Sequence, residues 1–221
     1  FRDLRCDGYI LHSRYLSDDD LRALAQQPTP FVLLDRYVAG LESRCITFDH
    51  RQASRLAVEH LIQQGHRRIA CITGPLQRQN SMLRKQGYLD AMQSAGVTPD
   101  ESWCEEGNYG RKSGYEAMKV LLHRHTDMTA VFSCSEEMTV GAMQCLQQFA
   151  IPVPEQISLT SFDSVDVCDG LYPTVSAVHF PISDMARAAV QVLMGLVQSN
   201  GAPEMPHFQA QLIKRHADRA L

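Results

Sequence analysis

The sequence of 221 residues predicts an α/β protein with doubly wound parallel sheets. Short apolar runs alternate with amphipathic segments from one end of the chain to the other, which is the rhythm of strand, helix and strand in such folds. Two helical segments end at a glycine, Gly65 and Gly96, the residue that most easily adopts the left-handed conformation after a helix. Residues 69–73 form a short apolar run rich in β-branched side chains, as buried parallel strands do.

The first part of the chain is expected to contain three strands and two helices. The strands are expected at residues 7–12, 31–34 and 45–48. Ser17 is expected to cap a helix whose first turn carries three aspartates at positions 18–20, because carboxylates stabilise a helix N-terminus. This pattern favours a capped helix over a metal-binding or catalytic cluster. A longer helix is expected at residues 51–64 and ends at Gly65.

The rest of the chain continues the same alternation. Strands are expected at residues 69–73, 103–106, 130–133, 157–162, 175–178 and 208–214. Helices are expected at residues 81–95, 113–123, 136–148 and 182–197. In open parallel α/β sheets, ligands bind at the carboxyl ends of the strands. The loops that leave these strands are therefore the first place to look for a binding site.

Composition narrows the classes of function. The formal net charge is −4 and the isoelectric point is near 6.1, so this chain alone is not expected to bind nucleic acid. Seven cysteines are scattered without a CxxC pair, which indicates buried apolar residues in a reducing compartment rather than a disulfide framework or a zinc site. No apolar stretch is long enough to span a membrane, and the first residues do not resemble a signal peptide. A cytoplasmic fragment is expected, because the chain starts at Phe1 and not at Met.

No motif indicates catalysis, a cofactor or a metal. The chain has no GxSxG, HExxH, P-loop or GxGxxG pattern, and residues 107–110 lack the third glycine that a dinucleotide site needs. His123 and His125 lie near a predicted helix end, where cations are favourable without any metal. We therefore expect neither an enzyme nor a cofactor-binding protein.

Polar and aromatic residues cluster at the predicted strand ends. They are Asp49, Arg78, Asn80, Arg84, Tyr109, Ser135 and Asp163. This mixture suits a sugar, because an arginine or a carboxylate can engage neighbouring hydroxyls while an aromatic ring covers the apolar side. Each residue alone is weak evidence, and Asp163 could equally cap the segment that follows it.

Several segments together resemble the LacI/GalR family of bacterial transcription repressors. They are HLIQQGHRRIACITGP, GNYGRKSGYEAM, TAVFSCSEEMTVGAM, VPEQISLTSFDSV and YPTVSAVHFP. The resemblance extends over essentially the whole chain, in order and with similar spacing. Segments near the start look most similar to repressors that respond to galactose or to β-glucosides.

The resemblance implies two similar α/β subdomains of the periplasmic-binding-protein type, with a small saccharide bound between them. The first would comprise residues 1–66 and 180–205 and would be incomplete, and the second residues 67–179 and 206–221. It also implies a homodimer that contacts operator DNA only through an N-terminal helix-turn-helix absent from these residues. Effector binding would shift operator affinity by its differential affinity for two closure states.

The resemblance also assigns roles to individual residues. Arg84 matches the family's effector-binding arginine, and Arg78 and Asn80 match loop residues near it. Tyr109 matches the aromatic residue of the family's GDF or GDW motif, and Asp163 matches the aspartate of its GYD or GFD motif. Asp49 matches the aspartate of the DN motif near the hinge, and Phe180 falls where the chain crosses back between subdomains and ligand contacts are common. Ser135 stands where the family usually has asparagine, so its contact with an effector should be weaker or different. Arg78 could bind a phosphate group, so the sequence leaves open whether the effector carries one.

Two alternatives remain on sequence alone. A periplasmic sugar-binding protein of a transport system shares the expected fold, although the scattered cysteines and the ending LIKRH favour a repressor. An enzyme of sugar metabolism on a similar scaffold is the other alternative, since a fold does not determine a function. No nucleophile, acid–base pair or metal-binding set supports it.

Overall fold

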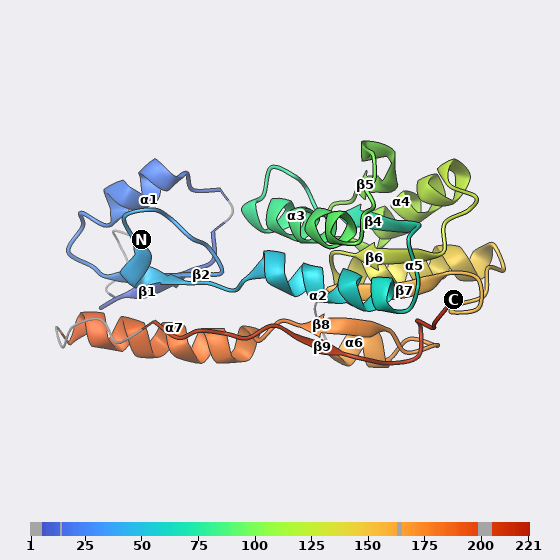
Figure 1. The fold of residues 1–221 in the computed structure, drawn as a ribbon. Helices are drawn as coiled ribbons and strands as arrows, with labels where there is room; N and C mark the ends of the chain where they lie inside the picture. Colours follow the sequence, from blue (N-terminus) through green and yellow to red (C-terminus); the bar gives the residue numbers. More distant parts are fainter. Residues whose placement is uncertain (1–5, 14, 163–164, 199–204) are drawn as a thin grey trace. The chain divides into compact units, whose positions relative to one another are not determined.

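The structure, a computed structural model, describes residues 6–13, 15–162, 165–198 and 205–221. Contacts divide the chain into two compact units (Figure 1). The first unit comprises Phe1–Phe48 and Pro181–Gln209, and the second comprises Asp49–Phe180 and Ala210–Leu221. Each unit has its own sheet, and the α/β class with parallel strands is confirmed.

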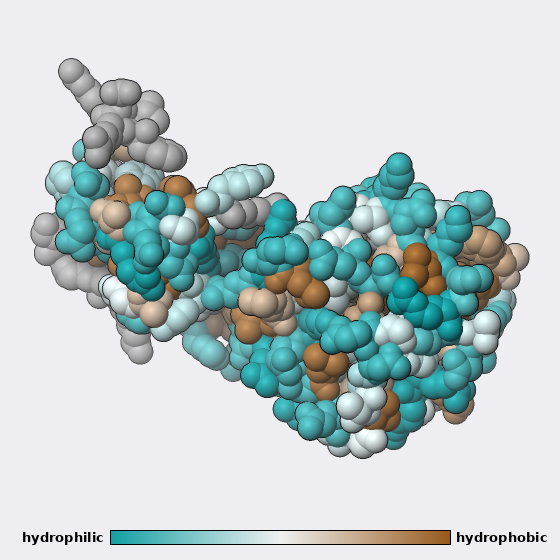
Figure 2. All heavy atoms as spheres, turned by 90° about the horizontal axis from the view of Figure 1, so that it is seen from above, coloured by the Kyte–Doolittle hydropathy of each residue, from teal (hydrophilic) through white to brown (hydrophobic). Residues whose placement is uncertain are grey.

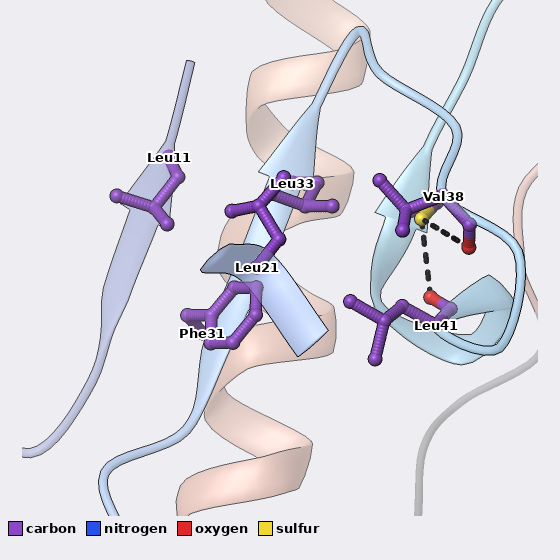
Figure 3. Packing of buried hydrophobic residues seen from close by; sticks show 7 residues of the cluster. Leu11, Leu21, Phe31, Leu33, Val38 and Leu41 are labelled. Carbon is purple, nitrogen blue, oxygen red and sulfur yellow. Dashed lines mark hydrogen bonds between the residues drawn. The ribbon is translucent and has the colours of Figure 1, made fainter. Parts of the chain in front are cut away.

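The first unit contains a three-stranded parallel sheet in the order β1-β2-β3. Its strands are β1 (Tyr9–Leu11), β2 (Phe31–Leu34) and β3 (Cys45–Ile46). Its helices are α1 (Asp18–Leu24), the 3-10 helix η1 (Glu42–Arg44) and α7 (Ile182–Val197), which packs on the sheet. The core consists of Leu11, Leu21, Phe31, Leu33, Val38, Leu41 and Cys45 (Figure 3).

Helix α1 begins as the sequence predicts. The Ser17 side chain accepts a hydrogen bond from the Asp20 backbone N–H, and the Asp20 carboxylate accepts one from the Ser17 N–H at 2.9 Å. Such a reciprocal capping box satisfies two backbone donors that a helix N-terminus leaves open. Asp18 and Asp19 pair with arginines at 2.7 and 2.8 Å. The three aspartates therefore stabilise the N-terminus of α1. Among the described residues, no group of acidic, histidine or cysteine side chains is arranged to hold a metal ion.

The second unit contains a six-stranded sheet in the order β5-β4-β6-β7-β8-β9, in which only β9 runs antiparallel to its neighbour. The strands are β4 (Ile69–Thr73), β5 (Cys104–Glu106), β6 (Ala130–Ser133), β7 (Ser158–Phe162), β8 (Ser176–His179) and β9 (Gln211–Ile213). The helices are α2 (His50–Gln63), α3 (Gln79–Ser94), the 3-10 helix η2 (Glu101–Trp103), α4 (Arg111–Arg124), α5 (Glu136–Gln148) and α6 (Val165–Asp169).

Glycines allow the helices of the second unit to pack closely in pairs. A Cβ atom on Gly87 of α3 would collide with the Arg51 carbonyl of α2, and one on Gly141 of α5 would collide with the Arg111 carbonyl of α4. The α2–α3 contact is reinforced by Arg51, whose guanidinium donates to both oxygens of Asp90 at 2.5 and 3.0 Å. The separation of α2 and α3 is therefore set by backbone contact.

The last residues of the chain complete the second unit. Strand β9 pairs with β8, and beyond it the Ala217 carbonyl accepts a hydrogen bond from the Leu159 N–H of β7 at 2.7 Å. Asp218 accepts from His60 of α2 at 2.7 Å, and both side chains are buried. Residues 210–221 thus join the sheet to α2 although they follow α7 of the first unit in the chain.

The structure places residues 49–66 differently from the sequence-based boundaries. Those boundaries put this segment in the first subdomain, whereas the contacts place it in the second unit. Ala57, Val58 and Leu61 of α2 are fully buried, and the helix packs on β6 to β9 and on α3. The predicted strand at 208–214 is also shorter, because only three residues pair with β8. Helix α6 was not predicted.

Candidate functional site

The candidate site lies at the carboxyl ends of β4, β6 and β7, which are neighbours in the second unit's sheet. These strands end at Thr73, Ser133 and Phe162. The loop after β4 leads to Arg78 at the N-cap of α3, and the loop after β6 leads to Ser135 at the N-cap of α5. Because the strands are parallel, these loops share one edge, where ligands bind in folds of this type.

Arg84 of α3 is held at this edge by three different groups. Its Nη1 donates to the Cys134 carbonyl at 2.6 Å, and its Nε donates to Nδ1 of His50 at 3.2 Å. Its guanidinium carbon lies 3.7 Å from the centroid of the Phe162 ring, and the residue is 6% exposed. A guanidinium has five N–H donors. Three of them therefore have no acceptor among the residues that the structure describes, and they remain available to a ligand.

Tyr109 provides an aromatic surface beside the two arginines of α3. Its ring rests against Gly74, where a Cβ atom would collide with it, and its backbone has a positive φ of 69°. Its hydroxyl forms a hydrogen bond of 2.5 Å with Oγ of Ser81. The guanidinium carbons of Arg78 and Arg84 lie 5.3 and 6.0 Å from the ring centroid. Both distances are within the range of cation–π attraction.

His50, Phe162 and Phe180 form a second aromatic group, which contacts Arg84 through His50 and Phe162. The His50 ring lies 5.4 Å from the Phe162 ring and 5.5 Å from the Phe180 ring, and the two phenylalanine rings lie 6.4 Å apart, all measured between centroids. His50 is 2% exposed and is the first residue of α2. The sequence interpretation missed His50. The signal available was its place directly after Asp49, at the start of a predicted helix.

Asp49 and Ser135 both cap helices. The Asp49 carboxylate accepts a hydrogen bond from the Gln52 N–H at 2.9 Å, and Oγ of Ser135 accepts one from the Met138 N–H at 3.4 Å. Ser135 is buried, and its carbonyl oxygen accepts two further side-chain hydrogen bonds within the unit. Helix capping therefore explains why an aspartate and a serine stand at these positions. The Asp49 carboxylate and the Ser135 hydroxyl can each accept a further hydrogen bond.

The predicted site residues are brought together to different degrees. Arg78 and Arg84 both lie within cation–π range of the Tyr109 ring, and Phe180 is linked to Arg84 through the rings of His50 and Phe162. Asn80 lies in the first turn of α3. Asp163 lies outside the described residues.

Five of the seven cysteines are buried, as the sequence indicates. Cys45, Cys71, Cys134, Cys145 and Cys168 are buried, Cys104 is partly buried and Cys6 is exposed, all with free thiols. Burial raises the pKa of Cys145 and of Cys168 to about 11.

Within the described part of the chain, no helix is long and apolar enough to cross a membrane. On the face shown in Figure 2, hydrophobic residues are scattered among hydrophilic ones.

The chain is similar in sequence to bacterial regulators. The profile of the periplasmic binding protein-like domain matches residues 58–217. The HTH-type transcriptional regulator GalR of Escherichia coli is 35% identical over 214 residues, which cover 96% of this chain and 62% of that protein. The ribose operon repressor of Escherichia coli is 31% identical over 191 residues, which cover 86% of this chain and 58% of that protein. The chain thus spans less than two thirds of these relatives.

Solved structures give the same result for the fold. A sugar-binding transcriptional regulator of the LacI family from Escherichia coli, in complex with phosphate, matches with a TM-score of 0.92 and 30% identity, over 100% of this chain and 80% of that one. A complex of the transcriptional regulator CelR with cellobiose matches with a TM-score of 0.88 and 29% identity, over 96% of this chain and 66% of that one.

Proposed function

This chain belongs to the periplasmic binding protein-like domain family and is similar to LacI-family regulators, and from this premise we propose that it is the effector-sensing core of a sugar-responsive transcriptional repressor. The proposed ligand is a small saccharide bound at the carboxyl edge of the second unit's sheet. The relatives named above are regulators, which favours this function over a transport protein or an enzyme.

The observation that carries the proposal is the partly engaged guanidinium of Arg84 near the ring of Tyr109. Arg84 keeps three N–H donors for a ligand, and the half-buried ring of Tyr109 offers an apolar face near it. A sugar needs both kinds of surface, because its hydroxyls accept hydrogen bonds while its C–H groups pack on aromatic rings. Charge-assisted hydrogen bonds are stronger than neutral ones, so Arg84 should dominate the affinity.

The other proposed contacts are the residues that the sequence and the family resemblance selected. Together with Arg84, the proposed effector-binding residues are Asp49, Arg78, Asn80, Tyr109, Ser135, Asp163 and Phe180. Asp49 and Ser135 would use the acceptor capacity that remains beside their capping bonds. Arg78 lies next to Tyr109 and would be the residue to meet a phosphate if the sugar carries one.

The proposal includes two partners of the whole protein. We propose that the full-length protein is a cytoplasmic homodimer and that it contacts operator DNA through a helix-turn-helix segment outside these 221 residues. The net charge of −4 supports a DNA contact made elsewhere, because this chain lacks the basic character of a nucleic-acid-binding surface. Sugar binding would then change operator affinity by population shift.

A thermal-shift screen tests the proposed ligand class. The chain is heated with D-galactose, cellobiose, D-ribose or inorganic phosphate, and the midpoint of unfolding is compared with that of the free chain. Ligand at ~100-fold above its dissociation constant adds about 2.7 kcal/mol to the free energy of unfolding, so moderate binding is visible. We expect at least one sugar to raise the midpoint. A shift with phosphate alone would indicate an anion site and would contradict the proposal.

A matched pair of variants on α3 tests the role of Arg84. Arg84→Met keeps much of the side-chain volume but removes the donors, and it should abolish the sugar-dependent shift. Met82→Ala changes an exposed residue of the same helix, 53% exposed, and should leave the shift unchanged. Equal sugar binding by Arg84→Met and the wild type would disprove the assignment of Arg84.

A further inference from the structure

We propose that His50 is the positioning residue for Arg84. His50 accepts a hydrogen bond from Nε–H of Arg84, and this bond orients the remaining donors of the guanidinium toward the effector. This inference rests on the proposed function, since it names the residue that orients its principal ligand-binding group. His50 itself is not proposed to contact the sugar. Its role is to fix the plane and rotation of the Arg84 side chain.

The chemistry of the pair determines the state of the histidine. Arginine carries only donors, so Nδ1 of His50 must be the acceptor in the 3.2 Å contact with Nε of Arg84. An imidazole nitrogen accepts only when it carries no proton. The bond therefore requires the neutral ring with its proton on Nε2, a tautomer inferred from the partner.

Two acceptors from different elements hold the guanidinium in its plane. Nε is held by His50 at the start of α2, and Nη1 is held by the Cys134 carbonyl in the loop after β6. The Phe162 ring covers one face at 3.7 Å. A planar group anchored at two points of its edge and on one face has little rotational freedom. Without the His50 acceptor, only the hydrogen bond to Cys134 would anchor the edge, and the guanidinium could turn within its plane over the Phe162 ring.

His50 is itself held in place by its surroundings. Its ring packs against Phe162 and Phe180 at 5.4 and 5.5 Å between centroids, and the residue is 2% exposed. His50 begins α2, one residue before Arg51, whose carbonyl lies against Gly87 of α3. The acceptor is therefore preorganised before any ligand arrives, which lowers the entropic cost of binding.

Two substitutions separate the acceptor from the ring. His50→Asn keeps a hydrogen-bond acceptor near the position of Nδ1 and removes the aromatic ring. His50→Phe keeps a ring that packs against Phe162 and Phe180 and removes the acceptor. A purely structural role of His50 predicts that His50→Phe is the milder change, whereas positioning through the acceptor predicts that His50→Asn is the milder change.

The experiment measures sugar affinity by titration calorimetry with D-galactose and cellobiose, and the unfolding midpoint without sugar. We expect His50→Phe to weaken binding on the order of ten-fold or more, as loss of one hydrogen bond to a charged group does. We expect His50→Asn to stay within about three-fold of the wild type. Wild-type affinity in His50→Phe, or weaker binding in His50→Asn than in His50→Phe, would overturn the inference.

A measurement on the unchanged chain covers the case in which a variant does not fold. Nitrogen-15 NMR of the histidine rings at pH 7.5 reports which nitrogen of His50 carries the proton. We expect a protonated Nε2 and a bare Nδ1, and a proton on Nδ1 would overturn the inference. If the wild type binds none of the sugars in the thermal-shift screen, the proposed function fails, while the NMR result still decides whether His50 accepts from Arg84.

Discussion

Gly87→Ala tests whether backbone contact sets the separation of α2 and α3. The added Cβ would collide with the Arg51 carbonyl and would lie 3.0 Å from both the Arg55 nitrogen and the Ser54 Cβ. A carbonyl cannot move aside as a flexible side chain can. The helices must therefore separate by about 1 Å, because a carbon and a carbonyl oxygen in contact lie ~3.3 Å or more apart.

The expected cost of Gly87→Ala follows from two opposing effects. Overpacking costs about 3 kcal/mol at the upper end of its usual range, which a collision with backbone justifies. The higher helix propensity of alanine returns about 1 kcal/mol. The net loss is about 2 kcal/mol in the free energy of unfolding, or a midpoint lower by about 4–8 °C for a chain of this size. Separation of the helices also lengthens the contact between Arg84 and His50, so sugar binding should weaken.

Circular dichroism during urea and thermal unfolding measures the loss of stability. Gln93→Ala is the control, because Gln93 is exposed on the same helix and its substitution should change the free energy of unfolding by less than about 0.5 kcal/mol. Gly87→Ala as stable as the wild type, or more stable, would show that α3 can shift without cost. In that case the packing argument would be wrong.

Three further predictions concern a buried hydroxyl, a buried histidine and the accessibility of the thiols. Tyr88→Phe removes the hydroxyl that donates to the Ile69 carbonyl at 2.8 Å, and urea unfolding should show a loss of about 1 kcal/mol; an unchanged midpoint would contradict this. Burial lowers the pKa of His66 in the folded chain, so the unfolded chain binds a proton more readily. The free energy of unfolding should therefore fall as the pH drops below about 6.5, the usual pKa of histidine, towards the lower pKa of the folded chain. His66→Gln should reduce this slope in unfolding experiments between pH 5 and 7, and an identical slope would exclude His66 as its source. A thiol reagent should modify Cys6 first and Cys104 more slowly, with the other five cysteines reacting only after unfolding; fast reaction of more than two thiols in the native chain would refute the burial pattern.

Much of the fold is predictable because its elements carry local signals. The strands at 31–34, 69–73 and 130–133 and the helices at 136–148 and 182–197 have the predicted bounds. Buried parallel strands are continuously apolar, and the serine that caps the helix at 136–148 marks its first residue. Strand β9 is less visible, because its residues are partly exposed and its pairing depends on a partner far away in sequence.

The site was only partly predictable for a physical reason. Arg78, Arg84 and Tyr109 follow predicted strands, so position along the chain was enough to select them. His50 belongs to α2 and Arg84 to α3, so their contact depends on how the two helices pack, and no periodic pattern contains this information. The same contacts explain why residues 49–66 belong to the second unit, although the sequence placed them in the first.

The position of residues 210–221 has a consequence for the order of assembly during synthesis. Asp218 meets His60 across 158 residues of sequence, and β9 reaches β8 only after the whole of α7 has been made. Contacts of such separation slow folding, because a long loop must close before they contribute. Until then the growing chain presents β8 as an unpaired strand edge, which is where another chain can pair. After the synthesis of β8 and before that of β9, this edge is therefore open to pairing with another chain.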